Sequence, residues 1–332
     1  MPGNRGESRR PRRGSGLAGL YSVIRRILGG VVVLWLVSVL TFLLIHLVPG
    51  DPAEFAAGEA ATPERVDAIR HQLGVDRPLL TQYFTWFGHV VRGDLGNSLF
   101  SSETVSGAIM RAAPATLSIT ILALLIAIAV GVPAGIIAGL RQGTWIDRAV
   151  SLMATVGIAM PGFWVGMLLV LIFSLATKWL PATGYASLSD GFGPWLQHAI
   201  IPAVALGLAT GAELARHARG SVGDVLARPY IRTALARGCS TMWLIRRHIL
   251  RNAAIPVVTV LGLQAGRLLG GAIVIEMVSG VQGLGTLAVN SILKRDFPVL
   301  QGYVLFAAAV VVVANLVVDA VYGRLNPKVR KA

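Results

Sequence analysis

The sequence predicts an all-α protein that crosses a membrane six times, and three observations carry this prediction. Of the 332 residues, 54% are hydrophobic and 14% are charged, whereas an ordinary soluble domain carries about 25% charged residues. Six stretches are apolar enough to form spanning helices. The net charge is nevertheless +14, and the basic residues fall mainly on one side of the predicted bilayer. This composition excludes a disordered chain, a coiled coil and a soluble nucleic-acid-binding protein.

The first predicted span covers residues 27–48 and follows a basic tail at residues 1–26. Its only ionisable residue is His46, which is expected to be packed or interfacial rather than a metal ligand. A signal peptide is the alternative, but its apolar region would be only about 7–15 residues long. We therefore expect a retained anchor.

A long segment at residues 49–114 separates the first two spans and is predicted to lie outside the cell membrane. A helix is predicted to begin at Thr62, Pro63 and Glu64, which supply a capping hydroxyl, a proline in the first turn and an acid at the positive end of the helix. Residues 79–91 predict a second amphipathic helix. The segment is too small for its own core, so it is either a connecting domain packed on the membrane part or a docking surface for another protein.

The membrane core is predicted at residues 115–323, with a short tail at 324–332. Its five spans are expected at residues 115–140, 150–177, 199–212, 255–280 and 303–322. Pro161 and Gly162 interrupt the second of these, which frees backbone groups that need partners inside protein or along a polar path. The span at 199–212 is the shortest and contains Pro202.

The basic residues predict the orientation of the chain. Alternating segments place 21 of the 30 Lys and Arg residues on the side of both termini and eight on the other side. By the positive-inside rule, both termini are cytoplasmic. The N-terminal arginines alone would also fit nucleic-acid binding, but the asymmetry of the whole chain already accounts for them.

The predicted cytoplasmic loop at residues 213–252 is long enough to carry structure of its own. Residues 230–237 are mixed polar and small, Gly238 reads as a helix end, and residues 242–250 predict a second helix. Two short helices joined by a glycine turn form a compact knob. The knob is either a plug for a groove in another protein or a surface hairpin held at the lipid headgroups.

Glycine ladders and buried charges mark the spans that pack closely. Gly131, Gly135 and Gly139 repeat every four residues, as do three glycines at 262, 266 and 270, and such faces allow close helix approach. Arg267 and Glu276 lie on opposite faces of one span. Glu276 is expected near the outer end, within reach of water. Arg267 is deeper, so it either has a structural partner or lines a polar passage. Asp319 is expected to pair with Arg324.

Sequence signals for catalysis are lacking. None of the four lysines follows a glycine, as an ATP-binding P-loop requires. The single cysteine, Cys239, permits neither an internal disulfide nor a cysteine-based metal site. We expect no enzyme activity, no metal and no cofactor in this chain.

The motifs together resemble one family, the permease subunits of bacterial ABC importers for di- and oligopeptides and nickel, of the first-permease type with an external insertion. The resemblance extends from about Arg25 to Arg330. It rests on the order and spacing of these segments: Arg25-Arg26-Ile27-Leu28, His46-Leu47-Val48-Pro49-Gly50-Asp51-Pro52, Leu73-Gly74-Val75-Asp76-Arg77-Pro78-Leu79, Arg92-Gly93-Asp94-Leu95-Gly96, Pro161-Gly162-Phe163-Trp164, Leu180-Pro181-Ala182-Thr183-Gly184, Tyr230 through Gly238, Gly283-Leu284-Gly285, Arg295-Asp296-Phe297-Pro298 and Asn326-Pro327.

The resemblance implies a type I ABC importer permease fold and a coupling role for the knob. Its coupling residues would be Thr233, Ala234, Ala236, Arg237 and Gly238, with Thr233 in place of the acid that names the family signature. The loop at residues 280–302 would face an external binding protein, through Gly283, Gly285, Arg295 and Asp296. Arg267, Glu276 and Pro161 are the hypothetical residues of the translocation path.

The implied partners are a second homologous permease, two ATPase subunits that bind ATP and Mg²⁺, and a substrate-binding protein outside the membrane. The chain is then a multi-pass protein of the bacterial inner or plasma membrane that forms half of a path for di- or oligopeptides. The same machinery carries nickel, glutathione or haem in other members. A stand-alone secondary transporter is the alternative outside this family.

Overall fold

The computed structural model describes residues 15–47, 51–57, 61–245 and 250–325, and those residues form an elongated bundle of helices. Four helices in this part are long and apolar enough to cross a membrane: Ile24–Leu43, Val105–Leu140, Phe192–Leu226 and Phe297–Val321. Two bent helix pairs raise the number to six if each pair is one span. The all-α membrane architecture is therefore confirmed, with two of the predicted spans broken.

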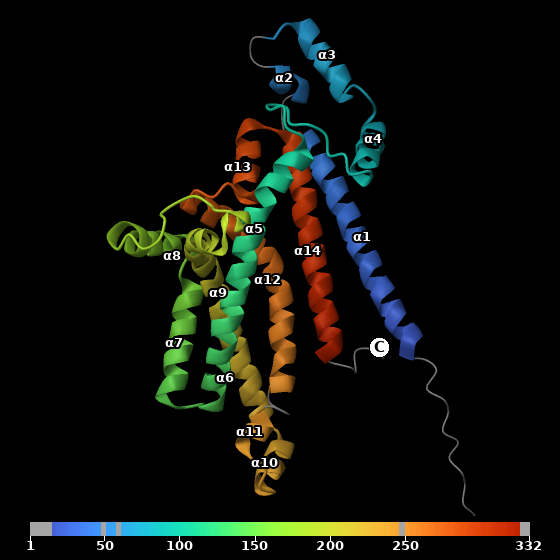
Figure 1. Cartoon of the computed structure of the whole chain (residues 1–332). Coiled ribbons are helices and arrows are strands. Elements are labelled where there is room, and N and C mark those ends of the chain that lie inside the picture. Colours follow the sequence, from blue (N-terminus) through green and yellow to red (C-terminus); the bar gives the residue numbers. More distant parts are fainter. Residues whose placement is uncertain (1–14, 48–50, 58–60, 246–249, 326–332) are drawn as a thin grey trace, which may run out of the picture.

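The insertion forms three helices at one end of the bundle, which we call the insertion end (Figure 1). They are α2 (Pro52–Ala57), α3 (Pro63–Leu73) and α4 (Leu79–Val91), and α4 has the predicted bounds. Thr62 and Pro63 begin α3 as expected, but the Thr62 hydroxyl makes no capping hydrogen bond. Tyr83 of α4 is buried against α1 (Ser15–Leu47), where its hydroxyl lies 3.0 Å from Ser38 Oγ. The insertion thus packs on the first span.

A continuous helix replaces the predicted boundary between the insertion and the second span. It runs through α5 (Val105–Ile126), a π-helical turn (Ala127–Gly131) and α6 (Val132–Leu140). Pro114, which suggested the boundary, lies inside this helix. A proline is tolerated within a membrane helix when neighbouring helices hold it in place. The helix therefore begins at Val105 rather than at residue 115. Its N-cap is Thr104, whose hydroxyl accepts a hydrogen bond from Gly107 N.

The first glycine ladder is a helix contact, as predicted. A Cβ at Gly131 would strike the backbone oxygen of Gly211, and one at Gly135 would strike that of Ala215. Both acceptors belong to α9 (Phe192–Leu226). The second ladder is tight only at its start: a Cβ at Gly262 would lie 3.0 Å from Val318, whereas one at Gly270 would meet nothing within 4 Å.

The break predicted at Pro161 and Gly162 is present, and it turns the chain sharply. Helix α7 (Trp145–Ala159) and the segment formed by α8 (Gly162–Leu169) with the π-helix Val170–Ala176 are bent by 101°. Figure 1 shows α8 running across the bundle rather than along it. The cause is local, since Met160 and Pro161 are both extended and a proline cannot continue the hydrogen-bond ladder of the preceding helix.

Helix α9 is the central helix of the bundle and is much longer than the predicted span at 199–212. It contacts α5, α6, α7, α8 and α12 (Leu250–Ser279), and Pro202 is buried within it. Its last turns cover residues 213–226, which were predicted to be loop. The charged residues in those turns shortened the apolar run, but the helix itself continues.

Four further helices complete the described part of the bundle. Short helices α10 (Pro229–Ala236) and α11 (Thr241–Leu244) follow α9 at the opposite end, the knob end. After α12, the chain forms α13 (Leu284–Lys294) at the insertion end and returns through α14 (Phe297–Leu325). At the knob end of α14, Asp319 pairs with Arg26 of α1 at 3.4 Å, while the predicted partner Arg324 lies outside the described side chains.

Candidate functional site

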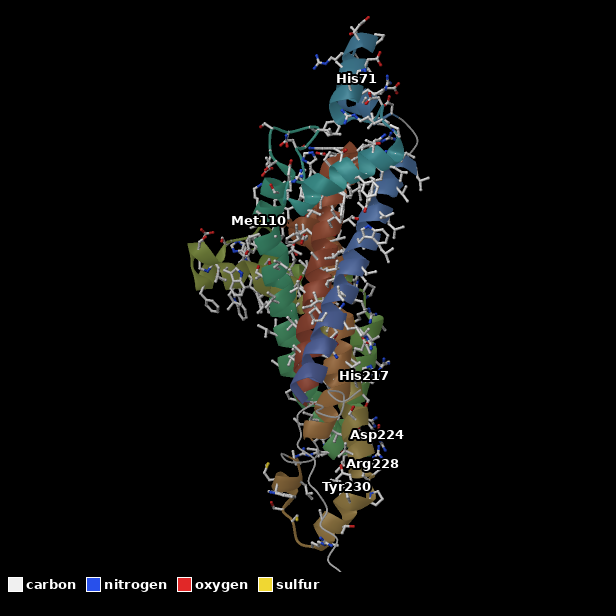
Figure 2. The ribbon with its side chains drawn as sticks, turned by 90° about the vertical axis from the view of Figure 1, so that its right-hand side faces the viewer. His71, Met110, His217, Asp224, Arg228 and Tyr230 are labelled. Atoms are coloured by element: carbon white, nitrogen blue, oxygen red, sulfur yellow. The ribbon has the colours of Figure 1, made fainter. Side chains whose placement is uncertain are left out.

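The knob, which comprises residues 229–244, is a small folded unit at the end of α9. Val222 and Val225 of α9 pack against Ile231 of α10 and Leu244 of α11, and all four side chains are buried. Figure 2 shows Asp224, Arg228 and Tyr230 where α9 leads into the knob. The knob is therefore fixed to α9, so a displacement of one moves the other.

The predicted coupling residues lie on the outside of the knob. Thr233, Ala236, Arg237 and Gly238 are exposed, and Ala234 is half-buried. Gly238 has φ +80°, a left-handed conformation that favours glycine. The N–H of Cys239 then donates to the Ala234 carbonyl at 3.1 Å, which closes the turn. The helix–glycine–helix prediction is confirmed for α10 and α11, while residues 246–249 lie outside the described part.

An ion pair between Asp147 and Arg219 joins α7 to the knob half of α9, and sequence analysis did not find it. Arg219 Nη2 donates to Asp147 Oδ2 at 2.9 Å and its Nε donates to Oδ1. The Asp147 carboxylate is buried and also accepts from Gly143 N at 2.9 Å. These residues are 72 positions apart, so no local pattern connects them.

Arg267 has a structural partner within the chain, which was one of the two alternatives that the sequence left open. Its Nη1 donates to Glu213 Oε2 on α9 at 3.0 Å, and Gln264 Nε2 donates to the same oxygen at 2.6 Å. The Arg267 side chain is still 69% exposed, whereas that of Glu213 is 25% exposed. Glu213 was placed in a loop by the sequence analysis and was therefore not recognised as an intramembrane acid.

Glu276 does not reach water, contrary to the prediction. Only 1% of the residue is exposed. Its Oε1 accepts from Thr116 Oγ1 at 2.5 Å and its Oε2 accepts from Thr286 N at 3.0 Å. The carboxylate faces the first turn of α13, where the positive end of the helix favours an anion. Position along the chain correctly placed Glu276 near the end of α12, but the loop that covers it comes from residues later in the sequence.

Gly283 and Gly285 belong to this buried cluster, and the role of their loop in facing a binding protein stays a prediction. Both are buried, and a Cβ at Gly285 would approach Glu276 Oε2 to 2.9 Å. Asp296 is also buried, where its Oδ2 accepts from Ser98 Oγ at 2.5 Å and its Oδ1 from Leu99 N at 3.3 Å. The lack of a side chain at Gly285 leaves room for the Glu276 carboxylate, and Asp296 links the loop to residues 98–99, which precede α5.

Arg295 differs from its neighbours because it is exposed and touches the insertion. Its guanidinium carbon lies 4.2 Å from the ring centre of Phe55 in α2, a cation–π contact. Its backbone is left-handed with φ +57° at the end of α13. Arg295 thus connects the loop at residues 280–302 with the insertion, and its proposed contact with another protein stays a prediction.

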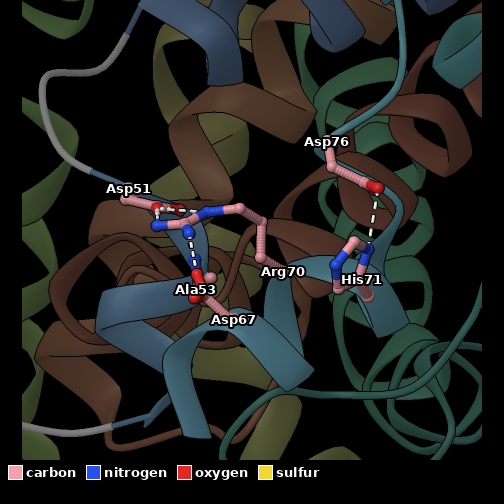
Figure 3. A network of polar contacts seen from close by, with 6 residues as sticks. All are labelled: Asp51, Ala53, Asp67, Arg70, His71 and Asp76. Atoms are coloured by element: carbon pink, nitrogen blue, oxygen red, sulfur yellow. Dashed lines mark hydrogen bonds and ion pairs between the residues drawn. The ribbon is translucent and has the colours of Figure 1, made fainter. Parts of the chain in front are cut away.

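A network of charges holds the insertion together, as Figure 3 shows. Arg70 of α3 donates from Nε to Asp51 Oδ2 at 3.0 Å and also pairs with Asp67. His71 Nδ1 lies 2.8 Å from Asp76 Oδ2. Burial alone would raise the pKa of Asp51, but hydrogen bonds from Arg70 and from Ala53 N outweigh it and hold the pKa below its ordinary value of 3.8. The carboxylate therefore stays ionised at neutral pH.

Pro161 and His46 have local structural partners. The Pro161 carbonyl accepts from Trp164 N at 3.0 Å, which begins α8. His46 is exposed, with Nε2 3.0 Å from Gln82 Oε1 and Nδ1 2.9 Å from the Phe42 carbonyl. Within the described ranges, no three His, Cys, Asp or Glu side chains are grouped to hold a metal ion. Whether Pro161 borders a passage stays a prediction.

The sequence matches known components of membrane transport systems. Residues 131–331 match the family model "Binding-protein-dependent transport system inner membrane component", and residues 20–120 match its N-terminal companion. The glutathione transport system permease protein GsiC of Escherichia coli (strain K12) is 44% identical over 311 residues, 94% of this chain and 99% of GsiC. GsiC of Salmonella choleraesuis (strain SC-B67) shows the same identity and coverage.

A solved structure shares the fold at low sequence identity. It is the native crystal form of the MetNI methionine ABC transporter in inward-facing conformations. The match has a TM-score of 0.52 and 17% identity, and it covers 66% of this chain and 96% of the other. At this identity the likeness shows the fold alone.

Proposed function

The chain belongs to the family of inner-membrane components of binding-protein-dependent transport systems and is a multi-pass permease subunit of an ABC importer. From this we propose that it forms half of a translocation path for di- and oligopeptides. The other half would be a second, homologous permease. Two ATPase subunits would bind ATP and Mg²⁺ at the knob end, and a substrate-binding protein would deliver cargo at the insertion end. In this arrangement both termini are cytoplasmic.

The knob is the single observation that carries the coupling part of the proposal. It exposes Thr233, Ala236, Arg237 and Gly238 beyond the end of α9, which leads from the region of α8 to the knob end (Figure 1). The cluster of Val222, Val225, Ile231 and Leu244 makes the knob rigid with α9. A rigid connection of this kind can convey closure of an ATPase pair to the far end of α9, so that access alternates between the two sides.

Glutathione is the second candidate cargo, and a specific observation favours it. Two relatives that are 44% identical over 94% of this chain carry the name glutathione transport system permease. Glutathione is itself a tripeptide, so both candidates share an extended peptide backbone and a terminal carboxylate. The binding protein would select between them before cargo reaches this chain.

The experiment that tests the coupling assignment uses two matched glycines. Gly238 and Gly143 both have φ +80°, and an added Cβ would meet nothing within 4 Å at either position. Gly238→Glu is expected to abolish co-purification of the ATPase subunits while the permease still inserts in the membrane. Gly143→Glu introduces the same charge and the same backbone strain at the α6–α7 turn and is expected to retain the ATPases. Equal recovery of the ATPases with both variants would refute the assignment.

A further inference from the structure

We propose that Arg267, oriented by Glu213, binds the carboxylate of the cargo as it crosses the membrane, so that this chain itself contributes to substrate selection. The inference rests on the proposed function, because it assumes that peptides pass along this face of the permease. The observations that carry it are the depth of Arg267, the exposure of its side chain, the open space beside it and the way its guanidinium is held.

Arg267 lies deep in a helix that spans the bundle. The part of α12 that can span a membrane runs from Val257 to Ser279 and is bent by 48° between Gln264 and Gly266. Arg267 follows this bend and lies about 15 Å along the helix from Val257 and about 18 Å from Ser279, at ~1.5 Å per residue. A guanidinium at this depth is unfavourable against lipid hydrocarbon and is found facing protein or a water-filled cavity. Since the side chain is 69% exposed in the isolated chain, the face that carries it must be covered by a partner or by the passage.

The surrounding face suits a passage for a flexible chain. Exposed positions recur along one side of α12, and they are Leu263, Gly266, Arg267, Gly270, Val274 and Met277. An added Cβ at Gly270 would meet nothing within 4 Å. Gly270 therefore leaves room on one side of Arg267, whereas a Cβ at Gly266 would touch Val311 of α14 at 3.9 Å. The apolar residues at both ends make no specific polar contacts with a passing backbone.

The guanidinium is oriented by its two neighbours but keeps donors to spare. Nη1 donates to Glu213 Oε2, and Gln264 Nε2 donates to the same oxygen, so the carboxylate is held from two sides. An arginine carries five N–H donors in a planar fork that matches a carboxylate in two parallel hydrogen bonds. The remaining edge of Arg267 can therefore bind a carboxylate while Glu213 holds Nη1. Peptides and glutathione both carry that group.

The experiment compares substrates that differ only in the carboxylate. Complexes of this chain with its second permease, ATPases and binding protein are reconstituted in proteoliposomes, and initial uptake is measured for trialanine and trialanine amide. Glutathione and its glycine ethyl ester form a second pair. Every variant receives cargo from the same binding protein. For each variant, the initial uptake of the acid is divided by that of the amide, and this ratio is compared with the wild-type ratio, so that selection by the binding protein cancels.

Arg267→Gln is expected to lower uptake of the free acids at least tenfold and uptake of the amide or ester less than twofold. Arg267→Lys keeps the charge without the fork and should fall between Arg267→Gln and the wild type. Glu213→Gln should reduce the acid-to-amide ratio less than Arg267→Gln, as expected of a positioning residue. The control Arg148→Gln removes an exposed arginine elsewhere and should leave the ratio unchanged.

Four outcomes would overturn the inference, and the last of them would also refute the proposed function. An equal loss of acid and amide uptake in Arg267→Gln and Arg267→Lys would mean a structural role. Loss of the second permease on purification of both variants would mean that Arg267 belongs to the subunit interface. Unchanged uptake of all probes would mean that cargo does not meet Arg267. Uptake of none of the probes by the wild type would instead refute the proposed cargo class, and the inference with it.

Discussion

The hydroxyl of Thr116 on α5 donates to the carboxylate of Glu276 on α12 at 2.5 Å, although 160 positions separate the two residues. Thr116 Oγ1 also accepts from Leu284 N at 2.7 Å. Three helices, α5, α12 and α13, therefore meet at one buried carboxylate. This junction closes the insertion end of the bundle directly beneath the loop that precedes α13.

Removal of the Glu276 carboxylate should destabilise the permease. Glu276→Ala leaves the Thr286 N–H and the Thr116 hydroxyl without their acceptor inside the protein, which costs about 1–3 kcal/mol for an unsatisfied buried group. Glu276→Gln should cost less because the amide oxygen still accepts. Thermal unfolding in detergent, followed by the loss of monodisperse protein, measures the difference. An Ala variant that melts with the wild type would show that the junction contributes nothing.

Close approach of α9 to the α5–α6 helix should depend on the absence of a side chain at Gly131. Gly131→Ala places a methyl group against the Gly211 carbonyl and should lower both folded yield and melting temperature. Gly220→Ala on α9 is the matched control, because nothing lies within 4 Å of its added Cβ. Alanine favours a helix over glycine by up to about 1 kcal/mol, so the control should be neutral or more stable. Equal stability of both variants would contradict the packing described.

The Asp147–Arg219 pair should matter more for coupling than for insertion into the membrane. Asp147→Asn removes the negative charge that pairs with Arg219. The free energy of unfolding should fall by only about 1–3 kcal/mol, because the arginine is partly exposed to solvent. A double-mutant cycle with Arg219→Gln isolates the pairwise term, read as melting temperature and as transport-stimulated ATP hydrolysis. Additive effects of the two substitutions would show that the pair is not coupled.

Acid should weaken the insertion only well below neutral pH. The pKa of folded Asp51 lies below its ordinary value of 3.8, so its pairing with Arg70 stabilises the fold above that value and is lost as the pH falls through the folded pKa. Hydrogen exchange of residues 51–76, corrected for the intrinsic pH dependence, should show constant protection down to about pH 4 and loss below it.

Arg70→Gln provides the comparison for this pH dependence, since the carboxylate then lacks its cation at every pH. Protection in the variant should already be reduced at neutral pH. Arg65→Gln, an exposed arginine on the same helix, should behave as the wild type does. If protection in Arg70→Gln matches the wild type across the range, the Asp51–Arg70 link does not hold the insertion.

Local features of the sequence predicted local structure well. Helix α4 begins and ends where its amphipathic pattern does, α3 begins at Pro63, and Gly238 ends α10 in a left-handed turn. These outcomes depend on residues a few positions apart. The glycine ladder at Gly131 and Gly135 also predicted a close helix contact, although it did not identify α9 as the partner.

The long-range contacts of the candidate site could not be predicted in the same way. Hydropathy placed Glu213 in a loop because the charges of the following residues end the apolar run, and its pairing with Arg267 spans 54 positions. Glu276 was expected at the water boundary because distance along a helix does not reveal a loop that folds over it. At Pro161 the sequence predicted a break in the helix but not its 101° angle, which follows from the extended backbone at Met160 and Pro161.

The central claim is that this chain moves peptides only as part of an ATP-driven importer, and uptake by reconstituted proteoliposomes tests it most directly. The complete complex should accumulate labelled trialanine or glutathione only with ATP and the binding protein present, and Gly238→Glu should abolish accumulation while the protein remains in the membrane. Uptake by this chain alone, driven by an ion gradient without the ATPases, would contradict the account.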